Sequence, residues 1–375
     1  MMGPCELFST AQRLLSDTPD FTLFVDDKNI TTDVKDRLIT MSLTDNRGFD
    51  ADQLNIELDD ADGKLALPRR GAVIRLKIGW AGQALTDKGA FTVDEIDHSG
   101  APDVLTITAR SADFRDTLNV KRNAAYHQVT LGDIIKTIAG RNNLTTGIAP
   151  EMAAIHLDHI DQTNESDANF LTRLAKLEGA IATVKAGKLL FIVPGQALTA
   201  SGKPLGEVII TRQDGDNHQF SIADRDAYTG VQAHWLDTLQ GRHKKVVVHR
   251  KKRKSQKKTG PVPNDGLTHK AEGDYLAGSD GNILVLRHTY AYEANAQRAA
   301  KAAWQRIQRG AASLSITLAK ARPDLFPELP VKVKGFKQQI NDVQWLITTV
   351  THELSDGGYT QSIEMEVRAQ DVDMD

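Results

Sequence analysis

Two eight-residue segments that lie far apart in this 375-residue chain follow one pattern, and this similarity constrains the fold more than any other feature. The segments are FTVDEIDH at 91–98 and WLITTVTH at 345–352, where a constant offset of 254 pairs Phe91 with Trp345 and His98 with His352. A Pro-containing loop and a short strand-like segment precede each one, and a Gly turn and an alternating segment ending in Arg follow it. Any two half-buried strands share alternation, but the shared flanking order favours an internal duplication.

The regions around both segments have the apolar–polar alternation of half-buried strands. Residues 20–116 contain several such runs joined by short turns rich in Asp, Gly, Asn and Pro, so we predict an antiparallel β-barrel there, preceded by an N-terminal arm over 1–19. Residues 205–375 return to this pattern and predict a second, related barrel. One helix interrupts it at 291–309, where the apolar spacing follows one helical face.

Residues 117–204 change period and predict a small α+β middle domain. Thr130 and Asp133 stand at the spacing of a capping box before an amphipathic helix. Ser166 is a candidate N-cap for a second helix, which Gly179 would end. The predicted fold is therefore mainly β with α+β elements: two related antiparallel tube-like barrels and a middle domain.

Length and composition limit the class of protein. A chain of 375 residues exceeds what one core normally serves, and 40% apolar residues suffice for packed cores. The single cysteine, Cys5, excludes an intrachain disulfide. The longest apolar runs are too short to span a bilayer, and the first residues lack the pattern of a signal peptide.

A dense basic segment, RHKKVVVHRKKRKSQKK at 242–258, stands out from an otherwise acidic chain. The chain has 46 basic and 49 acidic residues, and ten of the basic ones lie in this segment. We expect an inserted loop or hairpin that the fold does not need, because so many like charges must stay solvated or meet acidic groups. The candidate partner-contact residues are Arg242, Lys244, Lys245, Arg250, Lys251, Lys252, Arg253, Lys254, Lys257 and Lys258.

No combination of residues predicts catalysis or a bound cofactor. DDADGK at 59–64 lacks the later ligands of a calcium loop, and HLDHID at 156–161 lacks a second ligand pair at zinc-site spacing. GQALTASGK at 195–203 departs twice from the phosphate-loop pattern, and Cys5 has no histidine near it in the sequence. His98 and His352 fit repeated structural positions better than two half active sites. We expect no enzyme, no metal and no cofactor.

Several long stretches resemble the late control protein D family of P2-like phages. Among them are LTDNRGFDADQLNIELDD, KGAFTVDEIDHSGAPD, HIDQTNESDANFLTRLAKLEGA and RHTYAYEANAQRAAKAAWQRIQRG, and the resemblance extends from about residue 20 to the end. Members of this family are similar to baseplate hubs of contractile tails and of R-type bacteriocins, and to the N-terminal part of type VI secretion spike proteins. The resemblance implies no catalytic residues.

The resemblance implies a homotrimer in which three chains, each with two barrels, form a ring with pseudo-sixfold symmetry. Such a ring joins a hexameric tail tube to a trimeric central spike. The implied partners are the chain itself, the spike and the tail tube protein, with the tape measure protein and other baseplate proteins as further candidates and DNA contact left open. The implied location is a virion or phage-tail-like particle, assembled in the bacterial cytoplasm.

Two other functions remain as alternatives. A nucleic-acid-binding late regulator is suggested by the basic segment and by the historical family name, but it would need a recognition helix or an aromatic-lined basic groove. A hub-associated cell-wall hydrolase would need paired carboxylates or a zinc centre. The sequence shows neither set of features.

Overall fold

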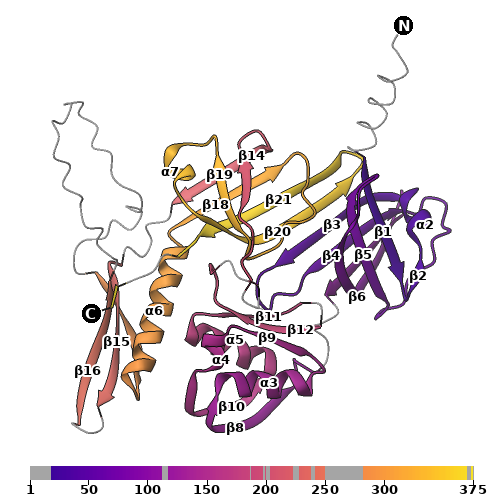
Figure 1. The fold of residues 1–375 in the computed structure, drawn as a ribbon. Helices are drawn as coiled ribbons and strands as arrows, with labels where there is room; N and C mark the ends of the chain where they lie inside the picture. Colours follow the sequence, from indigo (N-terminus) through magenta and orange to yellow (C-terminus); the bar gives the residue numbers. More distant parts are fainter. Residues whose placement is uncertain are drawn as a thin grey trace, which may run out of the picture.

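The computed structural model of the chain describes residues 18–111, 117–185, 187–196, 199, 203–222, 228–237, 241–249, 282–369 and 373–374. The fold is mainly β, as expected. A large sheet lies above a compact α+β unit, and a smaller sheet covered by one long helix stands beside both (Figure 1). Among the described residues, no helix combines the length and the apolar character that a membrane crossing requires.

The first half of the large sheet comes from residues before 112. Its elements are β1 (Pro19–Val25), β2 (Lys28–Asn29), α2 (Thr31–Lys35), β3 (Leu38–Asn46), β4 (Gln53–Asp59), β5 (Val73–Trp80), β6 (Thr86–Ser99) and β7 (Val104–Ser111). Alternate side chains enter the core, as the two-residue period of a strand requires. In β4 these are Leu54, Ile56 and Leu58.

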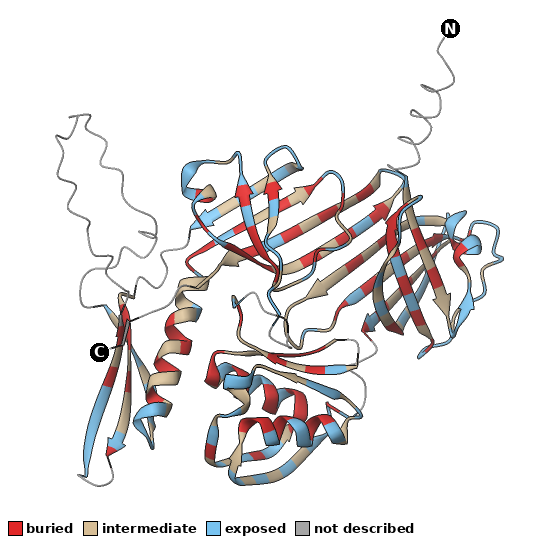
Figure 2. Cartoon of the chain, in the orientation of Figure 1, coloured by how far each residue is buried: buried red, intermediate tan, exposed pale blue. Residues whose placement is uncertain are grey.

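The second half of the large sheet comes from residues after 207. Its elements are β13 (Val208–Thr211), β14 (Gly215–Ile222), β18 (Ala312–Leu318), β19 (Pro330–Lys334), α7 (Gln338–Asn341), β20 (Trp345–Ser355) and β21 (Gly358–Val367). These strands enclose a second hydrophobic core around Trp345. Figure 2 shows the alternation of buried and exposed residues along the strands of both halves.

The two halves repeat one strand order. The order is β3-β4-β7-β6-β5-β1 in the first and β14-β18-β21-β20-β19-β13 in the second. Every neighbouring pair is antiparallel in both halves except the last, since β1 runs antiparallel to β5 whereas β13 runs parallel to β19. We call these halves the first and the second repeat unit.

The register also repeats, including its irregularities. Ile96 pairs with Ile107 in the first unit, and Val350 pairs with Ile363 in the second. The pairing shifts by one residue at matching points of two strand pairs. These points are between Val93 and Glu95 and between Ile347 and Thr349, and likewise between Leu38 and Thr40 and between Gly215 and Asn217. A β-bulge is a specific local feature, so two shared bulges support a duplicated unit more strongly than shared alternation does.

The two units join edge to edge. Strand β20 pairs antiparallel with β3, from Thr349 opposite Asn46 to Ser355 opposite Thr40. The two predicted barrels therefore share one thirteen-stranded sheet, with a separate core in each half. We call the contact between β20 and β3 the internal seam.

The middle unit follows the first repeat unit. It consists of β8 (Lys121–Thr130), α3 (Leu131–Arg141), β9 (Thr145–Ile148), α4 (Pro150–Ala153), β10 (His156–Ser166), α5 (Asp167–Glu178), β11 (Ile181–Lys185) and β12 (Lys188–Ile192). Thr130 and Asp133 form the expected capping box on α3, and Ser166 caps α5 through the amide of Asn169. Local sequence signals predicted both helix starts correctly.

Gly179 ends α5 at the point where α5 contacts a later helix of the chain. Its φ of +69° lies in the left-handed region, as expected of a glycine after a helix. An added Cβ would lie 2.9 Å from the Cβ of Ala302 in α6 (Glu293–Arg309). Beside it, Arg298 donates to Glu178 at 2.8 Å. Gly179 thus serves both the helix end and the close contact of α5 with α6.

The fourth part is a small α/β unit with its own core. It consists of β15 (Gly230–Asp237), β16 (Arg242–His249), β17 (Ile283–Tyr290), β22 (Asp373–Met374) and α6, with the strand order β17-β15-β16-β22. Trp304 and the alanines of α6 pack against Val231, Ala233, Val246 and Val248. In Figure 2 the buried face of α6 is turned toward this sheet.

This unit changes the interpretation of the basic segment. Residues 242–249 were expected as part of an inserted loop or hairpin that the fold does not need, but they form β16 and pair with β15 over its full length. Val246 is 3% exposed and Val248 fully buried, since alternate side chains of β16 face α6. The charges of the segment concealed this apolar face. Residues 250–258 lie outside the described residues.

Candidate functional site

The repeated positions occupy equivalent places in the two units. Phe91 lies opposite Ile74 in β5, and Trp345 lies opposite Val331 in β19. Both aromatic side chains are core residues, 1% and 0% exposed. The indole Nε1 of Trp345 donates to the carbonyl of Ile340 at 3.0 Å, so its polar atom is satisfied. These positions hold the units together and offer no surface for a ligand.

The repeated histidines stand on equivalent strands but in unlike surroundings. His352 is fully buried and lies 2.8 Å from the hydroxyl of Tyr359 through Nδ1. Burial, with a smaller effect of Lys88, lowers the pKa of His352 to about 2, so the ring is neutral in the folded protein. The side chain of His98 is 39% exposed and lies 3.2 Å from Asp60.

The basic segment presents only part of its charge on the described surface. Arg242, Lys244 and Lys245 are exposed on β16. The ammonium of Lys244 lies 2.7 Å from Asp237 and 5.3 Å from the centre of the Trp235 ring. The other candidate contacts lie outside the described residues, namely Arg250, Lys251, Lys252, Arg253, Lys254, Lys257 and Lys258.

Side chains of the two motifs that resemble metal sites, at 59–64 and 156–161, interact with other residues of the chain. His159 contacts both His127 and Asp161 at 3.0 Å on exposed strand surface. Asp62 accepts two hydrogen bonds from Arg37, which together with hydrogen bonds from Lys64 hold the pKa of its carboxyl well below its usual range. Over the described part of the chain, no group of three His, Cys, Asp or Glu side chains is arranged to hold a metal ion. Of the motif at 195–203, only residues 195, 196, 199 and 203 are described, and Cys5 is outside that part.

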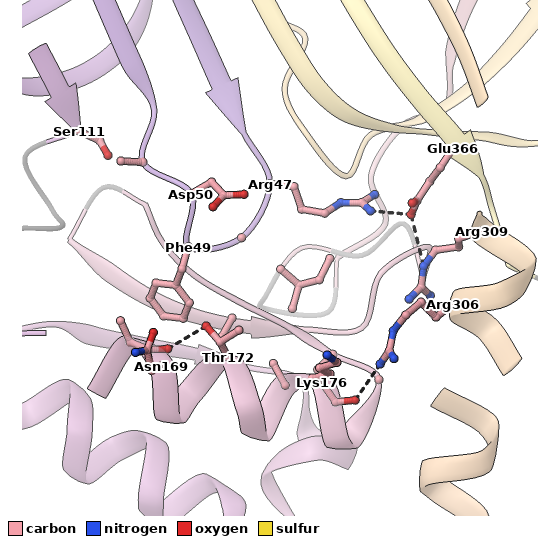
Figure 3. Close-up of a pocket in the computed structure, with 18 of the residues that line it drawn as sticks. Arg47, Phe49, Asp50, Ser111, Asn169, Thr172, Lys176, Arg306, Arg309 and Glu366 are labelled. Atoms are coloured by element: carbon pink, nitrogen blue, oxygen red, sulfur yellow. Dashed lines mark hydrogen bonds and ion pairs between the residues drawn. The ribbon is translucent and has the colours of Figure 1, made fainter. Parts of the chain in front are cut away.

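A hollow of about 950 Å³ lies where both repeat units, the middle unit and α6 meet (Figure 3). On one side, the guanidinium of Arg47 contacts Glu366 and Glu328, both at 2.5 Å, and Arg309 reaches Glu366 at 3.3 Å. Burial is the largest influence on two of these groups: it raises the pKa of Glu328 and lowers that of Arg309. The opposite charges offset part of this cost, and the network links the two repeat units beside the internal seam.

A further wall of the hollow belongs to α5, which α6 joins to the first side. Arg306 donates to the carbonyl of Lys176 at 3.1 Å, and Thr172 lies along the same face of α5 (Figure 3). Two ion pairs of Lys185 also link the middle unit to the first repeat unit: its ammonium lies 2.8 Å from Asp45 at the end of β3 and 2.5 Å from Asp52. The described lining contains neither His nor Cys. Its chemistry is that of a charged joint between units.

Sequence reasoning missed these joints. Arg47 and Glu366 are 319 residues apart, and neither belongs to a recognisable motif. The only available signal was the duplication itself, which predicts that the two units must meet somewhere. It does not indicate which charges lie at the contact.

Comparison with known proteins identifies relatives over nearly the whole chain. The family described as "Phage tail baseplate hub (GPD)" matches residues 46–358. The chain is 52% identical over 367 residues to the probable baseplate hub protein of Escherichia phage 186, covering 95% of this chain and 94% of that protein. It is 52% identical over 372 residues to the corresponding protein of Escherichia phage P2, covering 95% of each.

A solved structure has a similar fold at low sequence identity. The 43 kDa tail protein of prophage MuSo2 from Shewanella oneidensis matches with a TM-score of 0.66 and 14% identity, covering 94% of this chain and 98% of that one.

Proposed function

The chain belongs to the phage tail baseplate hub (GPD) family, and from this membership we propose that three copies form a pseudo-sixfold ring joining the hexameric tail tube to the trimeric central spike. The observation that supports the ring is the duplicated unit, with one strand order, one register and two shared bulges. Three chains with two such units each present six similar surfaces. A hexameric tube requires this number on the side that it contacts.

The parts that occur once in each chain suit the opposite side of such an adaptor. The middle unit and the α/β unit of β15, β16, β17 and α6 have no counterpart in the duplication. In a trimer each of them appears three times, which matches the symmetry of a trimeric spike. The ion pairs of Arg309 with Glu366 and of Lys185 with Asp52 would hold these single units in fixed positions relative to the sixfold surface.

The proposed role is structural and involves no catalysis. The exposed basic side chains of β16, Arg242 and Lys245, are the described candidates for contact with an acidic surface of another tail protein. Such contacts weaken as salt screens them. No feature of the described residues favours the DNA-binding or cell-wall-hydrolysing alternatives over this role.

Light scattering after size-exclusion chromatography tests the assembly. The chain has a mass of 41.1 kDa, and we expect a particle containing three copies when it is produced alone or with the spike protein. The spike protein alone serves as the control for the mass that it adds. A hub that remains monomeric in the presence of the spike would overturn the proposed function.

A further inference from the structure

Strands β14 and β6 of the large sheet each leave an edge without a paired strand among the described residues. Strand β14 is the last strand on its side of the sheet and pairs only with β18. Strand β6 pairs with β7 over its whole second half, but its pairing with β5 ends at Thr92. Residues 95–99 therefore have one open edge. An exposed edge of this kind is a template for pairing with another chain.

The duplication assigns a partner type to each open edge. Strand β14 occupies in the second unit the place that β3 occupies in the first, and β6 occupies in the first unit the place of β20. Inside the chain, β20 and β3 pair to form the internal seam. The edges of β20 and β3 are thus paired within the chain. The corresponding edges of β6 and β14 have no such partner in a single chain.

We propose that β6 of one copy pairs antiparallel with β14 of a second copy, in the register of the internal seam. In that seam Val350 is opposite Asp45 and His352 is opposite Leu43. The matching bulges place Ile96 at the position of Val350 and Ile222 at that of Asp45. They also place His98 at the position of His352 and Phe220 at that of Leu43. The register of the intermolecular seam is therefore Ile96 opposite Ile222 and His98 opposite Phe220.

The exposure of these side chains agrees with a missing neighbour. Ile222 is 48% exposed, and in the proposed seam it would meet the half-buried Ile96. The His98 side chain is 39% exposed, whereas His352 at the equivalent place is fully buried. Phe220 is only partly buried, whereas Leu43 is 3% exposed. His98 and Phe220 at the open edges thus correspond to more buried residues, His352 and Leu43, at the internal seam.

The chemistry of the two edges is also compatible. Inside the chain, Asp45 at the seam is held by Lys185 of the middle unit. Its counterpart is the apolar Ile222, and the residue opposite is the apolar Ile96, so the intermolecular seam buries no unpartnered charge there. The contact joins two different edges, and contacts of this type build a closed ring when their rotation closes. This inference rests on the proposed homotrimer and defines the strands that connect its copies.

Disulfide cross-linking at a chosen register tests the seam. In a Cys5→Ser background, Asp97→Cys with Ser221→Cys introduces two thiols directly opposite each other across the proposed seam, both at exposed positions. Asp97→Cys with Gln219→Cys is the matched control, shifted by two residues on the same face. Thr351→Cys with Thr44→Cys is the positive control, because these hydroxyls lie 3.5 Å apart across the internal seam.

We expect mild oxidation to shift the first variant from 41.1 kDa to two and three times this mass on a non-reducing gel. The shifted control should stay at the mass of one chain, and the positive control should form a disulfide within the chain. A trimer by light scattering that cross-links only in the shifted control, or in neither pair, would overturn the seam while leaving the proposed function intact. A protein that stays monomeric with the spike present would overturn both.

Discussion

Replacing Val248 by alanine tests whether the basic segment contains a structural strand. Val248 is fully buried on β16 against α6 and shares its core with Trp304. The change removes the equivalent of two methylene groups, worth about 0.8 kcal/mol each, and leaves a cavity. We expect a total loss of about 2–3 kcal/mol in the local stability of the α/β unit.

Hydrogen exchange measures this loss where it occurs, because a chain with several units does not unfold in one step. A loss of 2–3 kcal/mol should speed exchange in peptides of β15, β16 and α6 by roughly 30- to 150-fold. Val247→Ala is the matched control, since Val247 points to the opposite face of the same strand and is only half-buried. Equal effects of the two changes, or no effect of Val248→Ala, would refute the assignment of 242–249 as an integral strand.

Two further predictions concern single residues. Gly179→Ala should lower the local stability of α5 and α6 by about 1–3 kcal/mol in hydrogen exchange, because it combines a left-handed backbone with a Cβ 2.9 Å from Ala302. Gly82→Ala is the control: this glycine is exposed and left-handed, and an added Cβ there meets no atom within 4 Å, so the change isolates the backbone part. The folded-state pKa of His352, about 2, lies below its ordinary value of 6.5, so its contribution to stability is complete above pH 6.5 and is lost as the pH falls below it. The wild type should lose up to about 1.4 kcal/mol per pH unit in this range relative to His352→Gln, measured by hydrogen exchange in peptides of β20 and β21 at each pH.

Local signals in the sequence predicted much of the fold. The capping box at Thr130, the cap at Ser166 and the stop at Gly179 depend on residues within one turn of a helix, so a linear sequence contains all the information that they need. The duplication was visible for a similar reason, since alternation and turn order are local properties. Its full extent, including the matching bulges, needed the pairing register.

The parts that sequence reasoning missed depend on contacts between distant residues. Val246 and Val248 are buried because α6, more than forty residues later in the chain, packs against them. The density of lysine and arginine around them favoured an insertion that stays solvated or meets acidic groups. The pairing of Arg47 with Glu366 has no sequence signal, because it depends on how two units contact each other and joins residues 319 positions apart in the chain. A high density of charged residues indicates that their charged groups need solvent or a partner. It does not show which of the alternating side chains a neighbouring helix buries.

An electron cryomicroscopy map of the purified hub bound to its spike tests the central claim most directly. The account predicts three copies of the chain in a ring, with six similar sheet units around one axis and with β6 of each copy against β14 of the next. Equivalent strand pairing should occur at six seams, three inside chains and three between them. A map with another number of copies, or one in which β6 and β14 of neighbouring copies lie apart, would contradict the account.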